Sequence, residues 1–361
     1  MLFHWLYPLS EHFAGFNVFR YITFRSAGAI VTAVLLSLLL GPKFIRALER
    51  WSIGQNIRDE GPERHHTKAG TPTMGGVLVL FAVVVATVLW VDLTNPLVWV
   101  AVGVTCFFGA IGFLDDWLKL RRRQNLGLRA ATKFTLQMLV AAVGVGVLLS
   151  LPEEYRADST VALPFFKNAV FDIGWFYIPF AALLLVGASN SVNLTDGLDG
   201  LAIGAVLIAA ATYGIFTYIA GNTVVANYLQ VPYVRGAGEA AVFCSAVVGA
   251  SIGFLWFNAH PAEVFMGDVG SLALGGAIGV VAVLAKQEVV LALVGGLFVV
   301  EALSVIVQVA SFKLTGKRVF RMAPIHHHFE LIGWSEPKII VRFWIVAFLF
   351  ALLSLSTLKL R

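Results

Sequence analysis

Charged side chains are scarce in this chain of 361 residues. Only 13% of the residues are Asp, Glu, Lys or Arg, against about 25% in an average soluble domain. Hydrophobic residues make up 58% of the chain, and the mean hydropathy is +0.83. A composition this apolar argues against a soluble globular fold and predicts an integral membrane protein.

Cysteine is nearly absent as well. Cys106 and Cys244 both lie inside apolar runs, far apart in the sequence. Two such residues do not suit a disulfide framework or a metal site, so we interpret them as small packing residues.

The chain contains many long apolar runs. Runs of about 20 residues, enough for a helix to cross a ~30 Å hydrocarbon core, recur along almost its whole length. They favour helices over a β-barrel, whose strands would alternate over roughly ten residues. The sequence predicts an all-α integral membrane protein with a single domain over residues 1–361. The ten expected transmembrane helices lie at about 22–45, 72–92, 95–114, 131–151, 174–192, 199–220, 238–257, 270–286, 289–312 and 338–358.

Residues 1–20 differ from the apolar runs that follow. They mix aromatic residues with Glu11, His12 and Arg20, and they lack the small-residue end of a cleavable signal peptide. We therefore predict a retained segment that lies at the membrane interface.

Lysine and arginine are distributed unevenly over the expected connections. The first, third and ninth connections hold 18 of the 26 basic residues. By the positive-inside rule, the odd-numbered connections face the cytoplasm and both termini face the periplasm. Residues 314–337 are accordingly predicted to form a cytoplasmic loop.

Four acidic or histidine clusters fall on these cytoplasmic connections. They are GFLDDWLK with Asp115 and Asp116, NLTDGLDG with Asp196 and Asp199, FNAHPAEVFMGDVG with Asp268, and MAPIHHHFE with His326, His327 and His328. Because each cluster lies at a helix end on one side of the membrane, they predict one site assembled from distant parts of the sequence.

Two of the acidic clusters also suit a simpler, local role. Asp196 and Asp199 lie three apart at the start of a predicted helix, so they suit capping as well as a shared polar face. Asp268 precedes another predicted helix and suits an N-cap equally well. Thr71 and Pro72 suit the N-cap and first position of the second span, although a helix start also suits an anion.

Asp115 and Asp116 resist the capping explanation. They end a predicted helix at its C-terminus, where the helix dipole disfavours negative charge. Lys119 and the arginines that follow suit a neutralising role, and the alternative is a divalent metal or a proton-transfer site.

The histidine run does not have the spacing of a metal site. Three consecutive side chains do not aim at one ion as an i, i+4 pair does. Hydrogen-bond donation to phosphate or sugar suits His326, His327 and His328 better than zinc, and a solvated loop is the alternative.

Together the clusters favour phosphoryl transfer at a membrane surface. Carboxylates hold Mg²⁺, which commonly bridges substrate phosphates, and lysines offset the remaining negative charge. A secondary transporter, the alternative from another class, places ionisable groups near mid-membrane. Here the apolar runs are nearly free of charge except for Arg25 and Glu301. A structural scaffold needs none of these clusters.

The motifs also carry a family resemblance over essentially the whole chain. GFLDDWLK, SNSVNLTDGLDGL, FNAHPAEVFMGDVGSL and RMAPIHHHFEL together resemble the polyprenyl-phosphate hexosamine-1-phosphate transferases. KAGTPTMGG and PIHHHFE resemble the phospho-N-acetylmuramoyl-pentapeptide transferase branch. The resemblance implies transfer of phospho-N-acetylmuramoyl-pentapeptide from UDP to undecaprenyl phosphate, which releases UMP and makes lipid I for peptidoglycan. A transferase that acts on UDP-N-acetylglucosamine is the alternative within the superfamily.

The resemblance further implies Mg²⁺ dependence, a bacterial inner membrane, a homodimer and no nucleic-acid partner. Asp268 is the expected Mg²⁺ ligand, and Asp115 and Asp116 match the catalytic pair at the metal, with Asp115 expected to deprotonate or orient the lipid phosphate. The other expected catalytic residues are Lys133, His326 and His327. The expected substrate-binding residues are Lys68, Thr73, Asn190, Asn193, Asp196, Asp199, Asn258, Phe265 and His328, of which Phe265 and Asp199 are expected to contact uracil.

Overall fold

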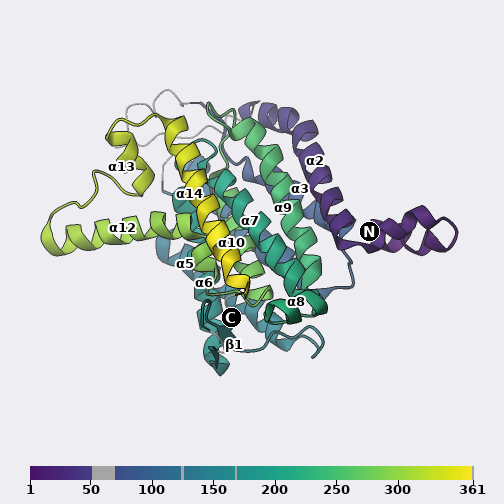
Figure 1. Ribbon diagram of the computed structural model, residues 1–361. Helices are drawn as coiled ribbons and strands as arrows, with labels where there is room; N and C mark the ends of the chain where they lie inside the picture. Colours follow the sequence, from purple (N-terminus) through teal and green to yellow (C-terminus); the bar gives the residue numbers. More distant parts are fainter. Residues whose placement is uncertain (51–69, 123–125, 167–168, 360–361) are drawn as a thin grey trace.

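The computed structural model describes residues 1–50, 70–122, 126–166 and 169–359, and most of them lie in long helices packed side by side (Figure 1). The α-helices are α1 (Leu2–Leu6), α2 (Ile22–Arg50), α3 (Gly76–Trp90), α4 (Pro96–Arg122), α5 (Ala130–Ser150), α6 (Tyr177–Thr195), α7 (Leu201–Ala220), α8 (Thr223–Leu229), α9 (Ala237–Asn258), α10 (Gly267–Leu284), α11 (Leu291–Val294), α12 (Gly296–Thr315), α13 (Ile325–Leu331) and α14 (Glu336–Ser356). The short 3₁₀ helices are η1 (Pro8–Glu11), η2 (Ala14–Arg20), η4 (Gly174–Phe176) and η5 (Thr357–Lys359).

Among the described residues, nine helices are long and apolar enough to cross a membrane. This confirms the predicted all-α membrane class. The expected second span falls on α3, which is shorter than the other nine. The count of ten spans and the orientation of the termini stay predictions.

Helix α10 lies at the centre of the bundle. Every residue from Val269 to Leu284 is buried, and the helix packs against α3, α4, α6 and α7. Glycines allow these backbones to meet: a Cβ on Gly76 would overlap the backbone of Gly270, and one on Gly112 would overlap the carbonyl of Asp268. The start of α10 is thereby held against α3 and α4.

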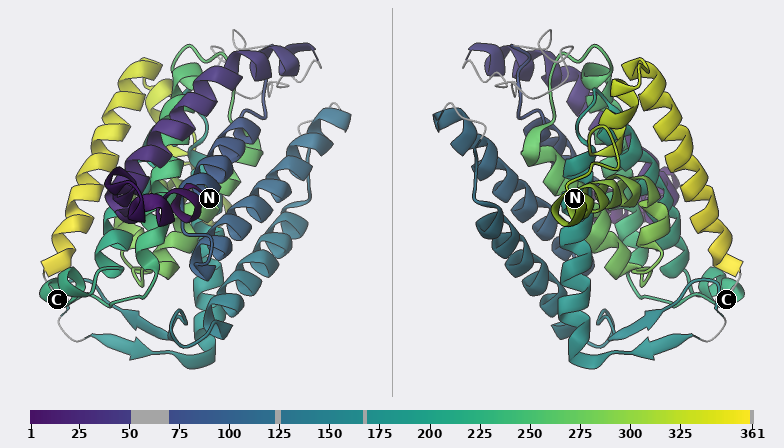
Figure 2. Two further views of the ribbon diagram at one scale, coloured as in Figure 1. Left: turned by 90° about the vertical axis from the view of Figure 1, so that its right-hand side faces the viewer. Right: turned by 90° about the vertical axis from the view of Figure 1, so that its left-hand side faces the viewer.

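The bundle has two distinct ends (Figure 2). The acidic end, as we call it, carries Asp115, Asp116 and Asp268. The hairpin end carries the antiparallel pair β1 (Thr160–Ala162) and β2 (Val170–Asp172), two short strands that the sequence did not predict. Lys286 attaches this hairpin to the bundle because its Nζ donates to the carbonyl of Thr160 at 2.6 Å and lies 3.0 Å from Glu288.

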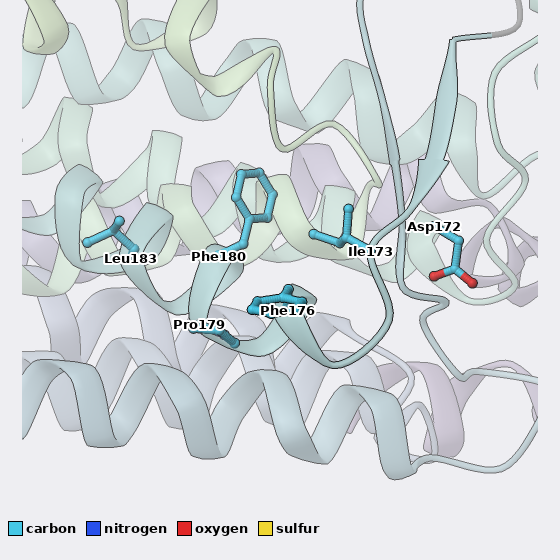
Figure 3. A pocket seen from close by; sticks show the side chains of 6 residues that line it. All are labelled: Asp172, Ile173, Phe176, Pro179, Phe180 and Leu183. Atoms are coloured by element: carbon cyan, nitrogen blue, oxygen red, sulfur yellow. The ribbon is translucent and has the colours of Figure 1, made fainter.

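An open apolar groove of about 670 Å³ lies beside β2 at the hairpin end (Figure 3). Its lining residues come from the end of β2, from η4 and the residue before it, and from the first turns of α6, and they are Asp172, Ile173, Phe176, Pro179, Phe180 and Leu183. The groove is therefore remote from the acidic end, to which the last turn of α6 belongs.

The N-terminal residues project from the side of the bundle as α1, η1 and η2 (Figure 1). They are fixed near the start of α2, where Arg25 makes two 2.6 Å hydrogen bonds to Glu239 on α9 and lies under the Phe3 ring. A charged residue inside an apolar helix is thus paired, as the cost of burying an unpaired charge requires. The interfacial position of residues 1–20 stays a prediction.

The expected span at 289–312 is not one continuous helix, although its second part, Gly296–Thr315, is long and apolar enough to cross a membrane. The segment is divided at Gly295 into α11 and α12, and α12 lies across the other helices and projects outward (Figure 1). A Cβ on Gly296 would overlap the Phe350 ring, so glycine allows α12 to start against α14. The expected loop 314–337 likewise contains a helix, α13.

Candidate active site

Three carboxylates and two lysines meet at the acidic end. Asp115 and Asp116 on α4 and Asp268 on α10 each offer an oxygen within 4.8 Å of the others. Lys119 Nζ lies 2.6 Å from Asp115 Oδ2 and 3.0 Å from Asp268 Oδ2, and Lys133 Nζ lies 2.7 Å from the same Asp268 oxygen. Three carboxylate oxygens so close could hold a divalent cation, and the two ammonium groups suit phosphate oxygens.

The start of α10 determines where Asp268 points. Gly267 has a φ of +73°, which favours glycine, and a Cβ there would lie 2.7 Å from Asp116 Oδ2. Asp116 Oδ2 accepts a hydrogen bond from the Val269 N–H at 3.2 Å. The side chain of Asp268 makes no cap and contacts the lysines instead, so the N-cap explanation is wrong.

Helix α6 brings amide side chains to the carboxylate cluster. Asn193 Nδ2 donates to Asp268 Oδ1 at 2.9 Å and to Ser271 Oγ at 2.8 Å. Asn190, one turn earlier, donates to Gln137 Oε1 on α5 at 2.8 Å. Asn193 therefore orients Asp268, while Asn190 joins α6 to the helix that carries Lys133.

Asp196 and Asp199 do not share a helix face. Asp196 ends α6 and Asp199 precedes α7, so both lie in the turn between the two helices. The buried Asp199 carboxylate accepts from the Ala262 N–H at 3.2 Å and contacts His260 Nδ1 at 3.1 Å. The Asp199 N–H donates to Glu336 Oε1 at 2.9 Å. The expected shared face is wrong because α7 begins only at Leu201, after both aspartates.

The carboxyl of Asp196 is perturbed by its surroundings. Desolvation raises its pKa to about 8, and the charges of Asp268, Asp116 and Asp199 add to the shift. The carboxyl of Asp196 is therefore mostly protonated near neutral pH.

Two loops close the site on the side of α9. Asn258 accepts from the Gly200 N–H at 3.1 Å and donates to the Val264 carbonyl at 2.8 Å. The Phe265 N–H donates to the Pro72 carbonyl at 2.8 Å, so Pro72 lies in a loop and α3 begins only at Gly76. The capping role expected of Thr71 and Pro72 is therefore wrong.

Thr73 and Phe265 flank the start of α10. A Cβ on Gly267 would lie 3.2 Å from Thr73 Oγ1, and the Phe265 side chain is partly exposed. Lys68, which was expected beside them, lies outside the described residues.

The three histidines are held in three different ways. His326 is fully buried and lies 3.1 Å from Glu301 Oε1. His327 Nδ1 lies 2.6 Å from Glu330 Oε2, and His328 Nδ1 accepts from the Arg321 N–H at 3.1 Å. Burial of His326 does not suit the direct contact with phosphate or sugar that the sequence suggested.

Known proteins match this chain over its full length. Residues 98–286 match the model of Glycosyl transferase family 4, and residues 68–80 match the phospho-N-acetylmuramoyl-pentapeptide-transferase signature 1. Proteins named phospho-N-acetylmuramoyl-pentapeptide-transferase from Desulfotalea psychrophila, Oleidesulfovibrio alaskensis and Nitratidesulfovibrio vulgaris are 57%, 58% and 59% identical, each over 100% of both chains. This chain belongs to the phospho-N-acetylmuramoyl-pentapeptide-transferase family. The resemblance found at the motifs is confirmed.

In this member of the phospho-N-acetylmuramoyl-pentapeptide-transferase family, sequence reasoning missed several residues at the acidic end. Lys119 was considered only as a neutralising charge, although its spacing of four from Asp115 on a helix places the two together. Gln137, Ser271, His260, Glu301 and Glu336 were given no role. Glu301 had a visible signal, since it is an acidic residue inside an apolar run.

Proposed function

We propose that this chain transfers phospho-N-acetylmuramoyl-pentapeptide from its UDP carrier to undecaprenyl phosphate, which makes lipid I and releases UMP. This is the first membrane step of peptidoglycan synthesis. The observation that carries the proposal is the carboxylate and lysine cluster on α4, α5 and α10, in a chain similar, over its full length, to enzymes of that name. A reaction between a soluble anionic donor and a membrane-held acceptor requires a site at the bilayer surface, where helix ends lie.

Charge is the central problem of this reaction, because a phosphate anion attacks a diphosphate. The cluster places two lysines against three carboxyl groups, so it has no surplus of positive charge to receive two anionic substrates. The three carboxylates have the oxygen ligands and the spacing that suit Mg²⁺. We therefore propose Asp268, Asp115 and Asp116 as the residues that hold it, and a bound Mg²⁺ would stabilise negative charge on the phosphates.

The protein groups each have a distinct part in the transfer. Asp115 is proposed to orient or deprotonate the lipid phosphate. No strong base is needed, since the second pKa of a phosphate monoester lies near 6. Lys119 and Lys133 would turn from the carboxylates to the phosphates and lower the repulsion between the two anions. We favour direct in-line attack over a covalent aspartyl-phosphate.

The donor nucleotide is proposed to bind beside the cluster. Phe265 is partly exposed and suits stacking on uracil, and Asp199 is proposed to accept from the base. The remaining residues proposed to bind substrate are Lys68, Thr73, Asn190, Asn193, Asp196, Asn258, His327 and His328. His326 is proposed to act indirectly because it is buried.

The surroundings of the enzyme are proposed from the same family membership. We place it in the bacterial cytoplasmic membrane as a homodimer, with the acidic end toward the cytoplasm. Helix α2, the first expected span, begins near the hairpin end, where Arg25 pairs with Glu239. Lys359, close to the C-terminus, lies over Tyr228 of α8. Both termini would then face the periplasm, as the basic residues indicate.

UMP release by the purified protein tests the function. The protein in detergent is given undecaprenyl phosphate and Mg²⁺, with UDP-N-acetylmuramoyl-pentapeptide or UDP-N-acetylglucosamine as the donor. Release with the muramoyl donor alone, and only when lipid and metal are both present, is the expected result. Release with the glucosamine donor would move the chain to the alternative specificity, and no release with either donor from folded protein would refute the transferase proposal.

A further inference from the structure

Glu301 and His326 form a buried pair outside the carboxylate cluster. Glu301 lies on α12 and His326 on α13, both side chains are fully buried, and His326 Nδ1 lies 3.1 Å from Glu301 Oε1. Within the part of the chain that the structure describes, neither Glu301 oxygen and neither His326 ring nitrogen makes a hydrogen bond. The two groups therefore face each other at ion-pair distance, without a hydrogen bond of good geometry between them.

Burial of either group costs free energy unless the other stays beside it. A buried carboxylate without a compensating partner is strongly unfavourable, and removal of one member leaves the other uncompensated. Glu301 thus restrains the position of the His326 ring, although the two residues belong to different helices.

The His326 ring in turn lies on the turn between α6 and α7. A Cβ on Gly197 would overlap Nε2 of His326, so the imidazole packs directly on this backbone. Glu336 at the start of α14 holds the same turn through the Asp199 N–H at 2.9 Å. The turn that carries Asp196 and Asp199 is consequently held between α13 and α14.

We propose that Glu301 is a positioning residue for the nucleotide part of the donor. It fixes the His326 ring, and the ring fixes the turn at residues 196–199. This inference rests on the proposed function, in which Asp199 contacts uracil. The ion pairs and hydrogen bonds of the carboxylate cluster do not involve Glu301, so its loss weakens binding of the UDP donor and leaves binding of the lipid acceptor unchanged.

Steady-state kinetics of Glu301→Gln with each substrate varied in turn tests this role. The variant keeps the size of the side chain and removes its charge. The KM for the UDP donor is expected to rise about tenfold, and the KM for undecaprenyl phosphate to stay within about twofold. In the double variant E301Q/H326Q, the rise is expected to be no larger than in the more affected single variant, because both residues act through one contact.

Glu288→Gln is the matched control. Glu288 is also a buried carboxylate in an ion pair, with Lys286, but it lies at the hairpin end. It is expected to lose thermal stability without a change in either KM. An equal rise of both KM values in E301Q, or the same donor-specific rise in E288Q, would show a merely structural role and overturn the inference.

A second variant and the activity of the wild type complete the test. If E301Q does not fold, Glu301→Asp, which keeps the charge on a shorter side chain, replaces it with the same criterion of a donor-specific KM change. Failure of the proposed function is distinguishable, since the wild-type protein would then release no UMP.

Discussion

Asn193 links α6 to the carboxylate cluster through single hydrogen bonds to Asp268 and Ser271. Partners that orient a metal ligand typically change metal affinity by about 10–100-fold when removed. Asn193→Ala is therefore expected to raise the Mg²⁺ concentration for half-maximal activity about tenfold, with the fold retained. A Mg²⁺ titration of UMP release measures this, and Thr135→Ala, an exposed hydroxyl on α5, is the control. An unchanged Mg²⁺ requirement would contradict the orienting role of Asn193.

The Asp196 carboxyl is expected to make the stability of the protein depend on pH. Its pKa is raised to about 8 in the folded protein, above the usual value of 3.8. The folded state therefore binds the proton more tightly, and the stability from this carboxyl is present at low pH and is lost as pH rises toward 8. Asp196→Asn is expected to flatten the decline in Tm between pH 6 and pH 8.5, as measured by thermal unfolding in detergent. Parallel curves for the variant and the wild type would refute this.

At the scale of elements, backbone contact between α4 and α10 sets the spacing of the carboxylates. Gly112 lies against the Asp268 carbonyl, whereas Gly103 on the same helix has open space around its Cβ position. Gly112→Ala is expected to separate the two helices, to destabilise the protein by about 1–3 kcal/mol and to reduce activity more than tenfold. Gly103→Ala is expected to leave both unchanged. Comparable effects of the two substitutions on Tm and on UMP release would disprove the role of this contact.

Most of the long helices could be predicted from the sequence, but the division of one helix and the two short strands could not. Apolar run length predicted α4, α5, α6, α7, α9, α10 and α14 because a helix must be about 20 residues long to cross a bilayer. The division of residues 289–312 into two helices could not be predicted, because Gly295 and Gly296 lie inside a continuous apolar run. Only the contact of Gly296 with the Phe350 ring in the structure shows why glycine is needed there. The strands β1 and β2 are too short to give a pattern.

For the whole molecule, the sequence predicted that the three carboxylates of the cluster meet, but it did not predict the contacts that hold them. An expected location on one side of the membrane was enough to group Asp115, Asp116 and Asp268. The predicted helix end at Asp115 and Asp116 is wrong, because α4 continues past them to Arg122. The contact between Asn193 and Asp268 joins residues 75 positions apart, and the burial of His326 depends on how α12 and α13 pack. Such pairings arise from tertiary packing, which no local pattern encodes.

If transfer occurs at the carboxylate cluster between α4 and α10, substitution of Asp268 must abolish most of it. Lipid I formation is measured in the wild type and in Asp268→Asn over a Mg²⁺ series, with thermal unfolding as the check on folding. We expect at least a hundredfold loss of activity that high Mg²⁺ restores only in part, since an amide is a poorer ligand than a carboxylate. Wild-type activity and an unchanged Mg²⁺ dependence in a folded variant would contradict it.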